Sequence, residues 1–294
     1  MEKVLVAGAT GYLGRYIVKE LARQAYYVKA IGRSKSKLQD LSPYLNEAIE
    51  AEVTRADTLE KALRDTDVVI STVGITRQKD GLTYMDVDYQ ANMNLLRMAQ
   101  AKGVKKFIYV SVFRGDQLTQ LKICEAKEKF AEELQQSGME YCIVRPDGFF
   151  SDMTEILNMA NNGRVYLIGN GECKANPIHG EDLAEVCVQS IHSQEKQIPV
   201  GGPEVLSHKQ IAQMAFAVCG KKAKITYLPL WLTQLVTFLA RTFTSSKTYG
   251  PVEFFLTAMS MDMVAPVYGK HTLQKHFEKV QKTGFDQLAG SPVS

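Results

Sequence analysis

The sequence is short of cysteine, of excess charge and of long apolar runs. Its five cysteines are scattered, and no pair has the spacing of a CxxC motif or a zinc knuckle. We therefore expect reduced thiols, no disulfide framework and no metal site. Lys and Arg total 35 against 32 Asp and Glu, and a net charge of +3 does not predict a nucleic-acid partner.

The sequence also begins without a signal-peptide pattern, because Met1 is followed almost directly by an apolar strand. Its most apolar stretch, residues 228–240, ends at Arg241 and is shorter than the roughly 20 residues of a bilayer span. We expect a cytoplasmic protein in which this stretch forms a buried helix of a C-terminal cap. Peripheral membrane contact or an apolar protein partner is the alternative.

What is present is an ordinary globular composition of 294 residues, 45% hydrophobic and 23% charged. Short continuous apolar runs alternate with helical patterns, which predicts an α/β fold with a parallel sheet covered on both faces. The expected strands are Val4–Ala7, Tyr27–Ile31, Ala48–Val53, Asp67–Val73, Lys106–Val110 and Glu140–Val144. The expected helices are Tyr12–Gln24, Thr58–Leu63, Met85–Lys102, Leu121–Gln136 and Asp182–His192, the last with Asp182 as its N-cap.

The clearest motif follows the first expected strand, where three glycines form a G-x-x-G-x-x-G pattern. Glycine lets a pyrophosphate approach the backbone, and the start of the following helix supplies N–H groups and a positive dipole end. The strand–turn–helix context favours a dinucleotide site over a tight turn alone. The candidate cofactor-binding residues of this turn are Gly8, Thr10, Gly11, Tyr12, Leu13 and Gly14.

The end of the second expected strand indicates which dinucleotide binds. NAD-binding chains usually place a carboxylate there for the ribose 2′-hydroxyl. Here Arg33, Lys35 and Lys37 follow the strand, and residues 31–37 contain no carboxylate. Arg33 is suited to a 2′-phosphate, because its guanidinium makes bidentate contacts. A solvated basic loop is the alternative, and the pattern favours NADPH over NADH.

With these motifs the sequence resembles the atypical short-chain dehydrogenase/reductases, in the NmrA-like and divinyl-chlorophyllide-reductase-like branch. The resemblance implies a Rossmann-type doubly wound parallel sheet over residues 1–148, to which residues 176–200 return. It also implies a small, mostly helical substrate-binding region made of residues 149–175 and 201–294. The matching segments are 8–14, 67–74, 103–111, 141–146 and 176–184.

The resemblance also implies roles for residues beyond the glycine turn. Lys127 and Ser111 are the catalytic candidates. On spacing alone, Lys127 is a solvated lysine of a charged helix and Ser111 is a strand-end hydroxyl. The further candidate cofactor-binding residues are Thr72, Val73 and Gly74 after the fourth strand, Lys127 at the nicotinamide ribose, and Pro146 near the nicotinamide.

The sequence departs from the family at the usual tyrosine proton donor, where it has Ile123. That departure leaves two functions open. One is an NADPH-dependent oxidoreductase that transfers a hydride to a hydrophobic carbonyl or an activated double bond. The other is a non-catalytic NADP(H)-binding protein that senses redox state or helps assemble a membrane complex.

Three further predictions concern residues outside the cofactor motifs. Asn92 occupies a position often filled by Asn in the family, and a helix-packing role suits it equally. We expect His179 to be architectural, packing and hydrogen-bonding beside a helix start. A group of apolar residues predicts either a wall for a bulky hydrophobic substrate or ordinary packing of the cap. That group is Phe149, Phe150, Met153 and Met159.

Overall fold

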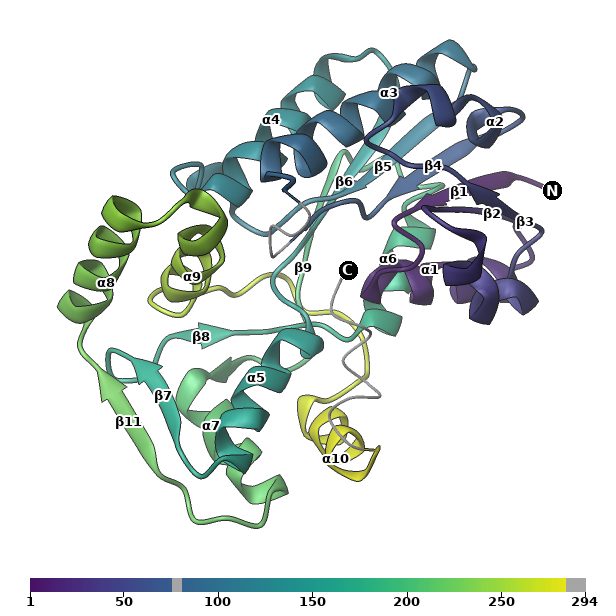
Figure 1. The fold of residues 1–294 in the computed structure, drawn as a ribbon. Coiled ribbons are helices and arrows are strands. Elements are labelled where there is room, and N and C mark those ends of the chain that lie inside the picture. Colours follow the sequence, from purple (N-terminus) through teal and green to yellow (C-terminus); the bar gives the residue numbers. More distant parts are fainter. Residues whose placement is uncertain (76–80, 284–294) are drawn as a thin grey trace. The chain divides into compact units, whose positions relative to one another are not determined.

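The computed structural model describes residues 1–75 and 81–283, which fall into two compact units (Figure 1). Unit 1 contains residues 1–145 and 183–198, and unit 2 contains residues 146–182 and those from 199 onward. The chain leaves unit 1 at the end of β6 (Glu140–Pro146) and returns within α6 (Gly180–Gln189). It leaves again within β9 (Gln197–Val200).

Unit 1 is built on a seven-stranded sheet in the order β3-β2-β1-β4-β5-β6-β9. The strands pair in parallel, with Val4 beside Val28 on one side and Val68 on the other. The order 3-2-1-4-5-6 is that of a doubly wound Rossmann sheet, so the predicted fold class is confirmed. The other strands are β1 (Lys3–Ala7), β2 (Tyr27–Gly32), β3 (Glu47–Glu50), β4 (Val68–Ser71) and β5 (Lys106–Val110).

Helices cover both faces of this sheet, because its strands are apolar on both sides. Residues 4–7 of β1 are all fully buried. Figure 1 shows α3 and α4 on one face and α1 on the other. Leu95 of α3 and Phe130 of α4 share a core cluster with Leu5 of β1. The helices concerned are α1 (Tyr12–Arg23), α2 (Glu60–Leu63), α3 (Asn92–Ala101) and α4 (Lys122–Gln136).

Two helical segments of unit 1 depart from α geometry. A 3-10 helix, η1 (Lys35–Tyr44), follows β2 at a place where the sequence predicted no element. A π-helix, η3 (Met85–Ala91), replaces the first turns of what we predicted as one continuous helix. Single π-turns are frequent at functional sites, and this one carries the buried carboxylate of Asp88.

Unit 2 packs helices around two short pairs of strands. β7 pairs with β11 in parallel, and β8 pairs with β10 antiparallel. Phe150 lies in the core of this unit with Phe216 and Phe277, which agrees with the packing interpretation of that residue. The elements are α5 (Phe150–Asn161), β7 (Val165–Ile168), β8 (Lys174–Ala175), β10 (Leu206–Ser207), α7 (His208–Val218), β11 (Ile225–Leu228), α8 (Leu230–Phe243), α9 (Ser246–Ala258) and α10 (Leu273–Thr283).

Asp182 is not the N-cap of its helix, so that prediction was wrong. α6 begins at Gly180, and Asp182 lies in its first turn. Its buried carboxylate accepts the backbone N–H groups of Lys270 and His271 at 3.1 and 3.0 Å. A tertiary contact with a segment 89 residues away therefore uses the oxygen atoms that a cap would have used.

α8 is not the buried cap helix that we predicted over residues 228–240. Thr233 is the buried residue of this helix, whereas Trp231, Phe238 and Phe243 are exposed. An apolar sequence indicates burial only where the fold supplies a surface to bury it against, and unit 2 supplies none for this face. Within residues 1–75 and 81–283, no helix is long and apolar enough to span a bilayer.

Candidate nucleotide-binding and catalytic site

The glycine turn lies at the point where the strand order of the sheet reverses, between β1 and β4. Gly8 has φ +85°, and a Cβ on it would lie 2.5 Å from Thr72 Oγ1. The Thr72 hydroxyl bonds to the carbonyl oxygens of Ala7 and Gly8, at 3.2 and 3.3 Å. The structure thus joins two predicted parts of the site, the glycine turn and the loop after β4.

The other two glycines of the turn have different surroundings. A Cβ on Gly14 would lie 2.2 Å from the Gly8 carbonyl oxygen, so Gly14 allows the helix to pack against the turn. A Cβ on Gly11 would meet only the Gly8 carbonyl oxygen, at 3.3 Å, and Gly11 has an ordinary φ of −76°. Packing therefore constrains Gly11 less than it constrains Gly14, whose Cβ would meet the same oxygen at 2.2 Å.

The start of α1 is suited to an anion. Gly11 is its N-cap, no side chain caps the helix, and its first turn contains no acidic residue. The first N–H groups of a helix and its dipole favour negative charge at this end. Leu13 is buried beneath the turn, while Thr10 and Tyr12 are partly exposed beside it. The Thr10 carbonyl is held from the other side by Arg15 Nε, at 3.1 Å.

Arg33 is exposed directly after β2, at the carboxyl edge of the sheet. Because Val6 of β1 pairs with Ala30 of β2, Arg33 and the glycine turn extend from neighbouring strands at the same edge. Ser34 then caps η1 through Ser36 N, at 3.3 Å. This is the placement that the sequence predicted for the group that meets the adenosine ribose.

The loop after β4 is fixed by a buried amide. Asn92 Nδ2 donates to the carbonyl oxygens of Val73 and Asp88, at 3.1 and 2.9 Å. Its Oδ1 accepts the hydroxyl of Ser71 at 2.6 Å. Asn92 is fully buried, so it acts by holding this loop in place.

Lys127 reaches the same loop from α4. Its Nζ lies 2.8 Å from Asp88 Oδ1, and the Asp88 side chain is completely buried. A Cβ on Gly74 would lie 2.7 Å from Lys127 Nζ and 2.6 Å from Asp88 Oδ1. Burial lowers the pKa of Lys127 and is the largest single influence, but the surrounding groups, Asp88 first and then Tyr109, together outweigh it and raise that pKa. Gly74 is thus the residue whose missing side chain makes room for a buried ion pair.

Asp88 escaped the sequence analysis, although a signal for the pair was present. Lys127 falls on the buried stripe of α4 with Ile123, Phe130 and Leu134, at i, i+4, i+7 and i+11. A lysine at such a position needs a buried partner, because an isolated charge in the core is costly. That spacing argues against the solvated-lysine interpretation. It does not identify Asp88, which comes from a different helix.

The position of the usual tyrosine is filled by buried Ile123. A different phenol lies nearby: Lys127 Nζ is 5.8 Å from the ring centroid of Tyr109, a fully buried residue of β5. The Tyr109 hydroxyl has no hydrogen-bond partner among the described residues. Burial raises the pKa of Tyr109, so it stays protonated at neutral pH.

Ser111 belongs to a buried network at the end of β5. Its hydroxyl donates to Glu128 Oε1 at 2.9 Å. Arg145 binds both oxygens of the same carboxylate, at 2.6 and 2.7 Å. The hydroxyl hydrogen of Ser111 is therefore committed, and its oxygen can only accept. Pro146, the last candidate, ends β6 and is the first residue of unit 2.

Unit 2 has its own cluster of polar rings. His179 is buried, and its ring lies 4.3 Å from that of His271 at an angle of 24°. His179 Nδ1 accepts the backbone N–H of Glu181 at 3.2 Å, the architectural role that we predicted. Ligand-type atoms of these three residues lie within 4.8 Å of one another, a proximity that chain spacing could not indicate. The two nitrogens of His271 already face carboxylates, Asp182 at 2.7 Å and Glu181 at 3.1 Å.

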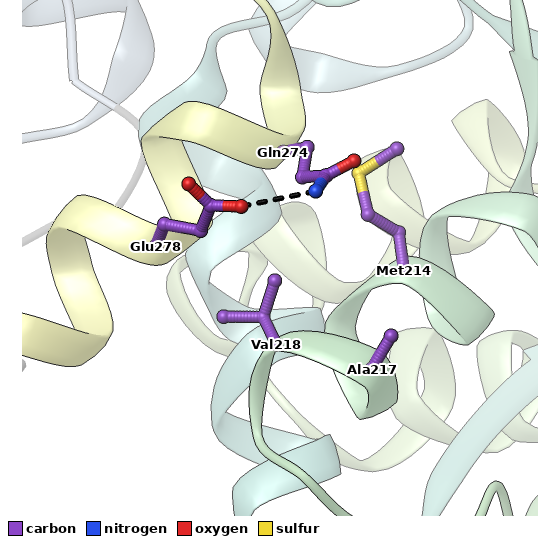
Figure 2. A pocket seen from close by; sticks show the side chains of 5 residues that line it. All are labelled: Met214, Ala217, Val218, Gln274 and Glu278. Carbon is purple, nitrogen blue, oxygen red and sulfur yellow. Dashed lines mark hydrogen bonds between the residues drawn. The ribbon is translucent and has the colours of Figure 1, made fainter.

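A pocket of about 450 Å³ also lies in unit 2, between α7 and α10 (Figure 2). Met214 and Val218 form its apolar side. Gln274 and Glu278 face them from α10 and bond to each other at 2.9 Å. This pocket combines an apolar wall with one hydrogen-bonded amide–carboxylate pair.

Sequence comparisons agree with this geometry. A family model described as NAD(P)H-binding matches residues 8–194. The chain is 30% identical to the chloroplastic divinyl chlorophyllide a 8-vinyl-reductase of Cucumis sativus, over 96% of this chain and 76% of that protein. It is 27% identical to the photosystem II assembly factor Ycf39 of Synechocystis sp., over 90% of this chain and 84% of that protein.

Two solved structures share the fold. The NADPH-dependent quinone oxidoreductase QOR2 from Escherichia coli has a TM-score of 0.70 at 17% identity, over 99% of this chain and 96% of that chain. The triphenylmethane reductase of Citrobacter sp. has a TM-score of 0.71 at 15% identity, over 96% and 100%. At these identities the likeness concerns the fold alone.

A Rossmann sheet with a glycine turn at its switch point defines a dinucleotide-binding protein. The chain belongs to the NAD(P)H-binding family, and within it to the atypical short-chain dehydrogenase/reductases.

Proposed function

We propose that this protein is an NADPH-dependent reductase that transfers a hydride to a hydrophobic carbonyl or an activated double bond. The observation that carries the proposal is the buried Lys127–Asp88 ion pair beside Gly74. A buried ion pair is seldom needed for stability, because desolvation offsets most of its attraction. Its position at the carboxyl edge of a dinucleotide-binding sheet favours a role in chemistry.

The described residues fit a bound NADPH. The backbone of Gly11, which carries no side chain, and the uncapped start of α1 would take the pyrophosphate. Arg33 would take the 2′-phosphate, which is the basis for preferring NADPH over NADH. When bound, the nicotinamide supplies the hydride, and the protein supplies orientation and electrostatics.

Lys127 is the residue that we assign to charge stabilisation. Hydride addition to a polarised double bond leaves negative charge on an oxygen or a neighbouring carbon. Because Asp88 raises the pKa of Lys127, the ammonium keeps its proton and acts as a fixed positive charge. The proton for the product then comes from water or from an acidic group of the substrate. Ser111, whose hydrogen is held by Glu128, can position a donor group through its oxygen.

The substrate class follows from the absence of a reactive phenol at Ile123 and from the relatives. Simple ketones are usually protonated by the family's tyrosine, so its replacement favours an activated double bond. One relative carries the name of a vinyl reductase acting on divinyl chlorophyllide a. We therefore place a conjugated, hydrophobic acceptor first among the candidate substrates.

The second candidate function is a non-catalytic NADP(H)-binding protein. Ile123 supports it, as does the similarity to an assembly factor, Ycf39. In that case the nucleotide site would be intact and the Lys127–Asp88 pair would serve binding alone.

Turnover separates the two functions. NADPH oxidation would be followed at 340 nm against enones, quinones and porphyrin-like acceptors, with NADPH affinity measured in parallel. With an active acceptor, Lys127→Met should lower turnover at least about a hundredfold, about 2.7 kcal/mol in barrier. Lys129→Met is the matched control, since Lys129 is exposed on the same helix and should keep wild-type turnover. Tight NADPH binding without turnover of any acceptor would support the second function.

A further inference from the structure

α8 exposes its apolar side and buries its polar side. Its outward side chains include Trp231 at 63% exposure, Phe238 at 65% and Phe243 at 79%. Leu235 and Leu239 lie on the same face, at helical spacings of four and eight residues from Trp231. An ordinary surface helix places such residues against the core.

The inward side of α8 is polar. A groove of about 370 Å³ separates α8 from α9, and Thr233 and Thr237 line it from α8. Arg241 of α8 forms an ion pair with Glu253 of α9, and Glu253 is nearly fully buried. The two helices thus meet through hydroxyls and charges as well as through apolar side chains such as Leu230 and Leu256. Trp231 and Phe243, two of the most exposed apolar side chains of α8, do not line this groove, and this is expected of a segment whose outer surroundings are apolar.

A contiguous apolar face that is exposed to solvent marks an interaction surface. The length of α8 limits the kind of apolar surroundings. Its 14 residues extend about 21 Å at 1.5 Å per residue, less than the roughly 30 Å of a bilayer core. A helix of this length can lie in the boundary between headgroups and acyl chains, with its apolar face down.

The charge of the surrounding sequence identifies the partner. Residues 205–252 contain six Lys and Arg and no Asp or Glu, although the whole chain is close to charge balance; two of the six, Lys209 and Arg241, pair with glutamates outside this stretch. Lys221, Lys222 and Lys224 are exposed just before β11, the strand that leads into α8. A second copy of the chain would bring this positive stretch against itself, whereas an anionic lipid surface complements it.

We propose that α8 docks unit 2 onto an anionic lipid bilayer. Trp231, Leu235 and Phe238 enter the headgroup–acyl boundary, and the lysines before β11 contact the lipid headgroups. The residues of this surface belong to unit 2 and include none of the candidate cofactor-binding or catalytic residues, so the proposal stands or falls independently of the reductase activity.

Trp231 is the only tryptophan of the chain and reports directly on this face. The full-length protein would be mixed with two kinds of vesicle. One contains phosphatidylcholine alone, and the other also contains about 30% phosphatidylglycerol, which is anionic. We expect a blue shift of the emission and protection from iodide quenching with the anionic vesicles. Flotation should show at least tenfold stronger binding to them than to phosphatidylcholine alone.

Two sets of variants assign the contact. Leu235→Ser combined with Phe238→Ser should lower binding at least tenfold, while both positions tolerate polar residues because they are exposed. Val267→Ser is the matched control, since Val267 is 62% exposed and lies outside α8. Lys222→Gln with Lys224→Gln should remove most of the preference for anionic vesicles.

Four results would overturn the proposal. They are no vesicle binding at all, equal binding to neutral and anionic vesicles, unchanged binding by the Leu235/Phe238 variant, and self-association in place of vesicle binding. The last result, seen by analytical ultracentrifugation and abolished by the same double substitution, would assign the face to a second copy of the chain.

Discussion

The two units of this protein use apolar and polar residues in opposite ways. Unit 1 buries its strands on both faces and places its buried charges in closed networks, such as Glu128 with Arg145. Unit 2 buries neutral imidazoles and turns the apolar face of α8 outward. The closed networks of unit 1 suit a rigid nucleotide site. The exposed apolar face of unit 2 suits a region that contacts an apolar partner.

This contrast shows that an apolar residue is buried only where the fold supplies a surface that covers it, as it does for Phe150 and Phe216 in unit 2 but not for Trp231. In unit 1 each apolar run has helices on both faces to pack against, and the runs became strands. In unit 2 the same apolar character in α8 found no covering surface. We therefore expect substitutions and pH changes that affect one unit to leave the stability of the other unchanged.

The largest effect is expected from two glycines of the same turn. Gly14→Val should lower the free energy of unfolding by about 3 kcal/mol or more, because its Cβ would overlap the Gly8 carbonyl oxygen. Gly11→Val should lower the free energy of unfolding by only about 1 kcal/mol, since its Cβ would meet a single atom, the Gly8 carbonyl oxygen, at 3.3 Å. Urea denaturation measures both.

The Gly11→Val variant also tests nucleotide binding, because it should remain folded. NADPH affinity of the folded Gly11→Val protein should fall at least about a hundredfold, about 2.7 kcal/mol, because the side chain occupies the expected place of the pyrophosphate. Calorimetric titration measures it. Wild-type affinity in a folded Gly11→Val protein would mean that the phosphates bind elsewhere.

The next largest effect is acid sensitivity confined to unit 2. Burial lowers the pKa of His179 to about 4 and that of His276 to about 4, against 6.5 when unfolded. As the pH falls, these imidazoles therefore bind protons in the unfolded chain before they do so in the folded protein. The stability that the neutral rings contribute is present above pH 6.5 and is lost as the pH falls toward 4. Between pH 7 and pH 5, each of these two imidazoles should lower the free energy of unfolding by about 2 kcal/mol.

Hydrogen exchange at the two pH values, corrected for the intrinsic rates, locates the loss. Peptides of α5 and α10 should lose protection at pH 5, while those of β1 and α1 should keep it. A His179→Gln/His276→Gln variant, weaker at pH 7, should show a smaller difference between the two pH values. An equal loss of hydrogen-exchange protection in both units at pH 5 would contradict the expected difference between them.

The smallest effect concerns cofactor choice. NADPH should bind at least tenfold more tightly than NADH, about 1.4 kcal/mol, through a charge-assisted contact of Arg33 with the 2′-phosphate. Arg33→Ala should remove most of that preference and leave NADH binding unchanged. Titration of both proteins with both nucleotides measures it, and equal wild-type affinities would contradict the assignment.

Much of unit 1 could be predicted because its signals are local. The strand–turn–helix pattern around Gly8 and the continuous apolar runs each depend on neighbouring residues. The partners of Lys127 and Ser111 could not be predicted, because Asp88 and Glu128 meet them through packing of separate elements. We predicted from spacing alone that Lys127 is solvated; the buried stripe on α4 argues against that interpretation, and only the fold shows that Asp88 is its partner.

The same reasoning explains the two wrong predictions. Asp182 has the residue type of a cap, but a distant segment supplies it with better donors. α8 has the composition of a buried helix, but burial depends on a partner surface that the sequence of the helix does not contain. Both of these residues or segments belong to unit 2, whereas in unit 1 the departures concern the type of helix, the π-helix η3 and the 3-10 helix η1.

The most direct test of the central claim is a crystal structure of the protein with NADP⁺. The account predicts the pyrophosphate against Gly11 and the start of α1, the 2′-phosphate at Arg33, and the nicotinamide ribose beside Lys127 and Gly74. A nucleotide bound away from the glycine turn, or one whose ribose lies out of reach of Lys127, would contradict it.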